Sequence, residues 1–196
     1  MVPAKSPRLL SVVCAALLLV ALPATATAAK DGGKRKARSA SQCANTDVVP
    51  EAGNLGEVRA AVLCLHNRER TERGLAPLKE HAKLRQAADG HAEDMVAGQF
   101  FAHDAPDGQD MVDRVLRTGY ARGAAGWSLG ENIAYASGHL ATAAQIHRAW
   151  MRSPGHRANI LRRQFREIGI GIALGVPVDA RGQDGATYAA DFGVRR

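Results

Sequence analysis

The chain has 196 residues, 46% of them hydrophobic, and a formal net charge of +7 at pH 7. This length is typical of one domain with appendages, and the hydrophobic fraction allows a packed core. The positive charge does not indicate a nucleic-acid-binding protein, because the basic residues are not interleaved with aromatic ones.

Residues 1–28 have the pattern of a signal peptide. Lys5 and Arg8 precede the apolar run Leu9–Leu22, and the small-residue stretch "PATATAAK" follows with Ala-x-Ala cleavage choices. The alternative is a membrane anchor, but the run is shorter than the about 18 residues expected of a span. We therefore predict an exported chain without a transmembrane span after cleavage, either released or associated with the cell wall.

Residues 29–47 are predicted to form a disordered basic arm. The stretch "KDGGKRKARSASQ" is polar and shows no apolar periodicity. Such an arm can bind an anionic wall or membrane surface, or it can simply keep the protein soluble, and both alternatives stay open. The folded domain is then expected at residues 48–196.

Two cysteines, Cys43 and Cys64, remain after cleavage of the signal peptide. An even count in an exported chain permits one disulfide, which ties the end of the arm to the first helix. The alternative is a pair of free, buried thiols.

Helices are predicted where apolar residues recur at spacings of three and four. They cover residues 55–73, 83–97, 108–119 and 141–152. Leu116 and Ala149 are assigned to inner faces, and His147 is expected to be solvated. The pattern then changes: residues 166–175 and 186–194 are predicted to be strands of a terminal hairpin, and 129–136 a third strand or extended segment. Helices with a small, mostly antiparallel sheet predict an α+β layered domain.

Three polar residues stand out as candidates for chemistry. His103 and His156 each follow the end of a predicted helix, and Glu131 enters the apolar run "LGENIAY". Two imidazoles and a carboxylate can bind a divalent metal such as zinc with an open position, or can form a hydrogen-bonded cluster that braces a cleft. No local metal-ligand motif such as HExxH is present.

Six ordered stretches resemble the CAP superfamily, which includes cysteine-rich secretory proteins, venom antigens and plant pathogenesis-related proteins. They are "LCLHNRERTERGLAPL", "FFAHDAPDG", "GENIAY", "AWMRSPGHRANIL", "FREIGIGIA" and "TYAADFG". "SPGHRANIL" is typical of the bacterial secreted branch. The resemblance implies a three-layer α-β-α sandwich with a small antiparallel sheet.

The resemblance also implies a cleft lined by two histidines and two acids that holds a divalent metal in some members. By motif, His103, Glu131 and His156 occupy three of these positions, and Ser153 stands where the second acid is expected. Serine is a poor zinc ligand, so we expect metal affinity to be lower than in those members.

The resemblance favours a secreted binding module at the bacterial envelope. Its ligand is expected to be a lipid, a peptide or a cell-wall polymer, with no nucleic acid among its partners, and the protein is expected to be monomeric. The alternatives are a metal-dependent, peptidase-like hydrolase that uses the same cleft, and a purely structural cluster without a ligand. The sequence contains no GxSxG motif or phosphate loop.

Overall fold

The computed structural model describes residues 42–178 and 184–196. The predicted signal peptide and residues 29–41 of the predicted arm lie outside the described residues, as does most of the turn expected between the last two strands.

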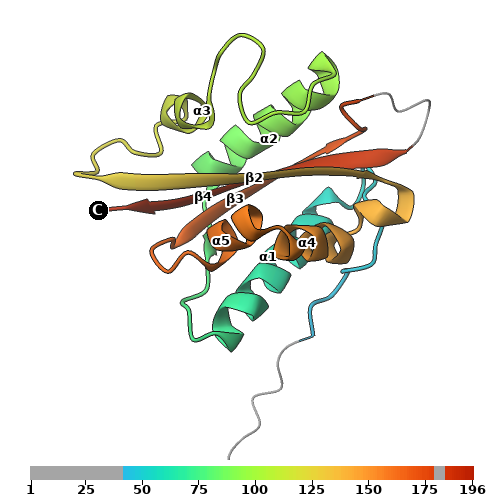
Figure 1. Ribbon diagram of the computed structural model, residues 1–196, viewed down its shortest axis with the longest axis horizontal. Helices are drawn as coiled ribbons and strands as arrows, with labels where there is room; N and C mark the ends of the chain where they lie inside the picture. Colours follow the sequence, from blue (N-terminus) through green and yellow to red (C-terminus); the bar gives the residue numbers. More distant parts are fainter. Residues whose placement is uncertain (1–41, 179–183) are drawn as a thin grey trace, which may run out of the picture. The chain divides into compact units, whose positions relative to one another are not determined.

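The domain has three layers, with a four-stranded sheet between two layers of helices (Figure 1). The upper layer in this view consists of α2 (Ala82–Gly98) and α3 (Met111–Arg117). The lower layer consists of α1 (Leu55–Glu72), α4 (Ala143–Arg152) and α5 (Pro154–Leu161). The strands are β1 (Lys79–Glu80), β2 (Trp127–Ser137), β3 (Glu167–Leu174) and β4 (Gly185–Arg195), and a short 3-10 helix covers Gly138–Ala141. The predicted α+β sandwich is confirmed.

The strand order is β1-β3-β4-β2. Strands β3 and β4 pair antiparallel, as the predicted hairpin requires, and β2 pairs antiparallel with β4. Only the two-residue β1, among the described strands, is parallel to its neighbour, β3. The segment 129–136, predicted to be a strand or an extended segment, is therefore a strand, β2, and it forms one edge of the sheet.

Helix α2 packs directly on the backbone of β3. A Cβ added at Gly171 would lie 2.1 Å from the carbonyl carbon of Ala88, and one added at Gly169 would lie 2.0 Å from the nitrogen of Arg85. The alternation of Ile and Gly in β3 thus gives the strand side chains for the lower core and a bare face for α2. Gly169 and Gly171 therefore allow the backbone of this helix to approach the strand closely.

The end of the predicted arm belongs to the folded domain. Cys43 and Cys64 form a disulfide, as predicted. The carbonyl of Thr46 accepts a hydrogen bond from the backbone nitrogen of Ala144 at 2.8 Å. The domain therefore begins a few residues before the predicted boundary at residue 48.

Several residue-level predictions were wrong. Leu116 is 39% exposed and Ala149 is exposed, so neither lies on an inner face. His147 is buried rather than solvated, because its Nδ1 lies 3.0 Å from Nδ1 of His66 between α1 and α4. The segment after α4 is a further helix, α5, which begins at Pro154.

Candidate functional site

Glu131 is the centre of a buried polar cluster at the edge of the sheet. It lies on β2, and its side chain is only 2% exposed. Its Oε1 accepts a hydrogen bond from Nδ1 of His103 at 2.7 Å, and its Oε2 accepts one from Nη2 of Arg114 at 2.8 Å. Both carboxylate oxygens therefore have a charge-assisted partner, as a buried carboxylate requires.

Arg114 connects this carboxylate to the loop that carries His103. Helix α3 begins after Asp110, whose side chain accepts a hydrogen bond from the backbone nitrogen of Asp113. The helix places the Arg114 guanidinium against the loop. Nη2 also donates to the carbonyl of His103 at 2.8 Å, and Nη1 donates to the carbonyl of Gln109 at 3.2 Å. One buried guanidinium thus fixes both ends of the loop.

The imidazole of His103 is fixed in one orientation. Because an ionised carboxylate only accepts hydrogen bonds, Nδ1 of His103 carries the hydrogen and Nε2 is left for another partner. The side chain is 53% exposed. The hydrogen bond to Glu131 raises the pKa of His103. Burial acts to raise the pKa of Glu131, but the His103 hydrogen bond and the Arg114 charge outweigh it and lower that pKa.

His156 lies on α5, which a network of asparagines ties to β2. Asn132 donates to the carbonyl of His156 at 3.0 Å, and Asn159 donates to the carbonyl of Glu131 at 3.1 Å. Burial and the charge of His103 lower the pKa of the partly exposed His156. Ser153 is the N-cap of α5, and its side chain makes no capping hydrogen bond.

Asp191 is a second buried carboxyl group beside Glu131. It lies opposite Glu131 in the β2–β4 register and is fully buried, and neither of its oxygens has a hydrogen-bond partner among the described residues. Burial, followed by the Glu131 charge, raises the pKa of Asp191 well above its ordinary value. The sequence reasoning missed both Arg114 and Asp191.

The family model of the cysteine-rich secretory protein family, CAP, matches residues 63–177. The chain belongs to this family. The CAP domain is 36% identical over 110 residues to the protein YkwD and 32% identical over 111 residues to the membrane protein YlbC, both of Bacillus subtilis (strain 168) and both described as uncharacterized. The matches cover 56% and 57% of this chain but 40% and 30% of the relatives. The chain thus spans less than half the length of either relative.

Solved structures support the CAP fold. An extracellular protein with an SCP domain from Bacillus anthracis str. Ames superposes with a TM-score of 0.54 at 28% identity, over 74% of this chain and 41% of that one. An outer surface protein from Borrelia burgdorferi gives a TM-score of 0.56 at 17% identity, over 69% of this chain and 90% of that one. The second likeness is evidence for the fold alone.

A small cavity opens beside His103 on the surface of the CAP domain. It has a volume of about 260 Å³ and is lined by His103, Asp104, Asp110, Met111, Val112 and Glu131. At the neighbouring surface, the rings of Phe101 and Tyr135 pack edge to face with centroids 4.8 Å apart, and each residue is 39% exposed. The cavity therefore combines an oriented imidazole with the apolar side chains of Met111 and Val112.

In this CAP cleft, Glu131 is not free to act as a metal ligand together with His103 and His156. Both oxygens of Glu131 are occupied, and the adjacent Arg114 guanidinium repels a cation. Within residues 42–178 and 184–196, no group of three or more His, Cys, Asp or Glu side chains is placed to hold a metal ion. Glu131 instead has the position of a partner that orients an imidazole. A divalent ion in the cleft stays a prediction.

Among residues 42–178 and 184–196, no helix is long and apolar enough to cross a bilayer.

Proposed function

We propose that this CAP protein is an extracellular binding module whose cleft at His103 holds a short peptide segment. The observation that carries the proposal is the half-exposed His103 imidazole, held by the fully paired Glu131. A polar group fixed before binding loses little conformational entropy when it pairs with a ligand.

The lining of the cavity favours a peptide among the three expected ligand classes. In this proposal Nε2 of His103 accepts a hydrogen bond from a backbone N–H of the peptide, and Met111 and Val112 provide apolar contact. The exposed Phe101–Tyr135 pair, outside the cavity, adds aromatic surface for a flanking residue of the peptide. At about 260 Å³ the cavity is slightly smaller than typical small-molecule sites, so it fits one side chain and its flanking backbone.

The experiment is affinity selection from a random heptapeptide library on the purified protein, followed by fluorescence polarisation with the enriched peptides. We expect His103→Ala to weaken binding at least about tenfold, which corresponds to the loss of one good hydrogen bond. The matched control is His139→Ala, because His139 is an exposed histidine in the 3-10 helix.

Two results would contradict the proposal. In one, no peptide is enriched while vesicles of anionic lipid retain the protein. In the other, His103→Ala and His139→Ala bind the enriched peptides equally well. Cleavage of the enriched peptides instead of retention would favour the hydrolase alternative.

A further inference from the structure

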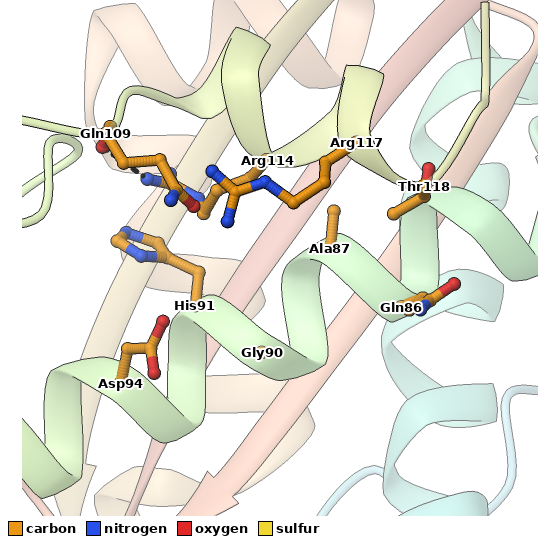
Figure 2. A pocket seen from close by; sticks show the side chains of 9 residues that line it. All are labelled: Gln86, Ala87, Gly90, His91, Asp94, Gln109, Arg114, Arg117 and Thr118. Atoms are coloured by element: carbon orange, nitrogen blue, oxygen red, sulfur yellow. Dashed lines mark hydrogen bonds between the residues drawn. The ribbon is translucent and has the colours of Figure 1, made fainter.

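A second cavity lies behind Arg114, between α2 and α3 (Figure 2). Its volume is about 230 Å³. The guanidinium of Arg114 points its two terminal nitrogens at the Glu131 cluster and the His103 loop, and the same side chain lines this cavity. His103 and Glu131 do not line it, so it is distinct from the peptide cleft.

The floor of the cavity is the face of α2 that carries Ala87 and Gly90. Gly90 lies inside the helix, where glycine costs about 1 kcal/mol relative to alanine. A Cβ added there would meet nothing within 4 Å. Packing therefore does not require this glycine, unlike Gly169 and Gly171, and its effect is to leave space above the helix.

The two walls of the cavity carry opposite charges. Helix α3 supplies Arg114 and Arg117, and α2 supplies the exposed carboxylate of Asp94. In the part of the chain that the structure describes, Arg117 and Asp94 form no ion pair with each other or with a third residue. The charge of Arg114, by contrast, is already paired with Glu131.

The inner wall adds polar atoms without partners. The side chain of His91 is fully buried, and its Nε2 donates to the carbonyl of Ala102 at 3.0 Å. Its Nδ1 is therefore an unprotonated acceptor, and it has no partner among the described residues. Nε of Arg114 is a donor that likewise has no partner among the described residues, and the Arg114 residue is only 5% exposed. The side chain of Gln109 reaches over these atoms, and its oxygen accepts hydrogen bonds from both terminal nitrogens of Arg117 (Figure 2).

We infer that this cavity binds a small zwitterion of the α-amino-acid class. The planar guanidinium of Arg117 suits a carboxylate, which replaces the Gln109 oxygen and accepts two parallel hydrogen bonds. The carboxylate of Asp94, on the opposite wall, suits an ammonium group. The open space above Gly90 accommodates the carbon skeleton between them.

The test is an NMR titration of the purified protein with L-alanine, acetate and methylammonium, followed at the backbone amides of Gly90, His91 and Thr118. We expect a saturable shift with L-alanine and a dissociation constant at least about tenfold weaker for either single-charge fragment, because each fragment lacks one charge-assisted contact. Arg117→Gln and Asp94→Asn are each expected to weaken L-alanine binding by about tenfold.

Gly90→Leu is the blocking variant. Its Cβ meets nothing within 4 Å, its side chain extends into the open space, and leucine improves helix propensity, so the protein is expected to fold and to lose L-alanine binding. His103→Ala is expected to leave L-alanine binding unchanged, which separates this site from the peptide cleft. The inference is overturned if L-alanine gives no saturable shift, if acetate binds as tightly as L-alanine, or if binding survives Gly90→Leu.

Discussion

Arg114 is the residue on which the geometry of the cleft depends most. Its buried guanidinium neutralises Glu131 and accounts for the hydrogen bonds that hold both ends of the His103 loop. Buried ion pairs often add little net stability, but removing one partner leaves the other charge buried without compensation. Removal of Arg114 alone is therefore expected to lower stability by more than the ion pair contributes to it.

Arg114→Met keeps most of the side-chain volume and removes the charge. We expect the free energy of unfolding to fall by about 3–5 kcal/mol, because Glu131 then lacks its cationic partner in a buried position. Urea denaturation measures the change, with Arg122→Met as the control at an arginine outside the cluster. A loss below about 1 kcal/mol, equal to that of an exposed hydrogen bond, would mean that Arg114 does not support the cluster.

At this scale the sequence predicts the cluster only in part. Glu131 is an unusual charge in an apolar run, and its pairing could be expected. Arg114 could not, because a basic residue in a short helix normally faces solvent. The neighbouring Val115 gives no clear signal, because adjacent residues of a helix point about 100° apart. Asp191 offers a clearer one, because it interrupts the otherwise apolar strand "ATYAADFGV".

At the scale of elements, the contact of α2 with β3 is the tightest constraint. Gly171→Ala is expected to lower the free energy of unfolding by about 3 kcal/mol or more, since the new Cβ would overlap the backbone at Ala88 and neither element can move cheaply. Thermal unfolding followed by circular dichroism checks this. Gly53→Ala is the control, because nothing lies within 4 Å of its added Cβ, and equal stability of the two variants would refute the packing argument.

Helices α1 and α4 meet at the buried pair of His66 and His147. Burial lowers the pKa of His147 to about 4 and that of His66 well below its ordinary value. The unfolded chain binds protons near pH 6.5 while the folded pair stays neutral. The pair therefore makes its full contribution to stability above pH 6.5, and this contribution is lost as the pH falls toward 4.

We expect the free energy of unfolding to drop by on the order of 3 kcal/mol between pH 6.5 and 4 because of His147 alone, and by more because His66 also stays neutral. Urea denaturation at a series of pH values measures the drop. Replacing both His66 and His147 with leucine should make the pH dependence shallower, whereas His139→Ala should leave it unchanged. An identical pH dependence in the leucine variant would rule out the pair as its cause.

The elements themselves are largely readable from local pattern. The predicted helices agree with α1, α2 and α4 within a few residues, since apolar spacing and glycine stops act locally. Strand β1 could not be predicted, because two residues are too few to show an alternation of apolar and polar side chains. Only pairing with β3 makes these residues a strand. The burial of His147 could not be predicted for a similar reason, because its partner His66 is distant in the sequence.

For the molecule as a whole, the disulfide ties the start of the described chain to α1. It joins cysteines 21 residues apart. Replacing both Cys43 and Cys64 with serine is expected to cost about 3 kcal/mol of unfolding free energy, chiefly because the unfolded chain regains conformational freedom. Denaturation of the wild type in a reducing agent should give the same loss. If the serine variant is as stable as the oxidised protein, the bridge does not stabilise the domain.

The whole arrangement, a sandwich that presents one oriented imidazole at the edge of its sheet, depends on the bond between His103 and Glu131. A ¹⁵N NMR titration of the His103 ring, in the wild type, Glu131→Gln and the exposed control Glu93→Gln, tests it most directly. We expect the neutral ring to carry its hydrogen on Nδ1, with a pKa above the ordinary value of about 6.5 in the wild type and in Glu93→Gln, and a lower pKa in Glu131→Gln. A hydrogen on Nε2, or the same pKa in all three proteins, would contradict the proposed cleft.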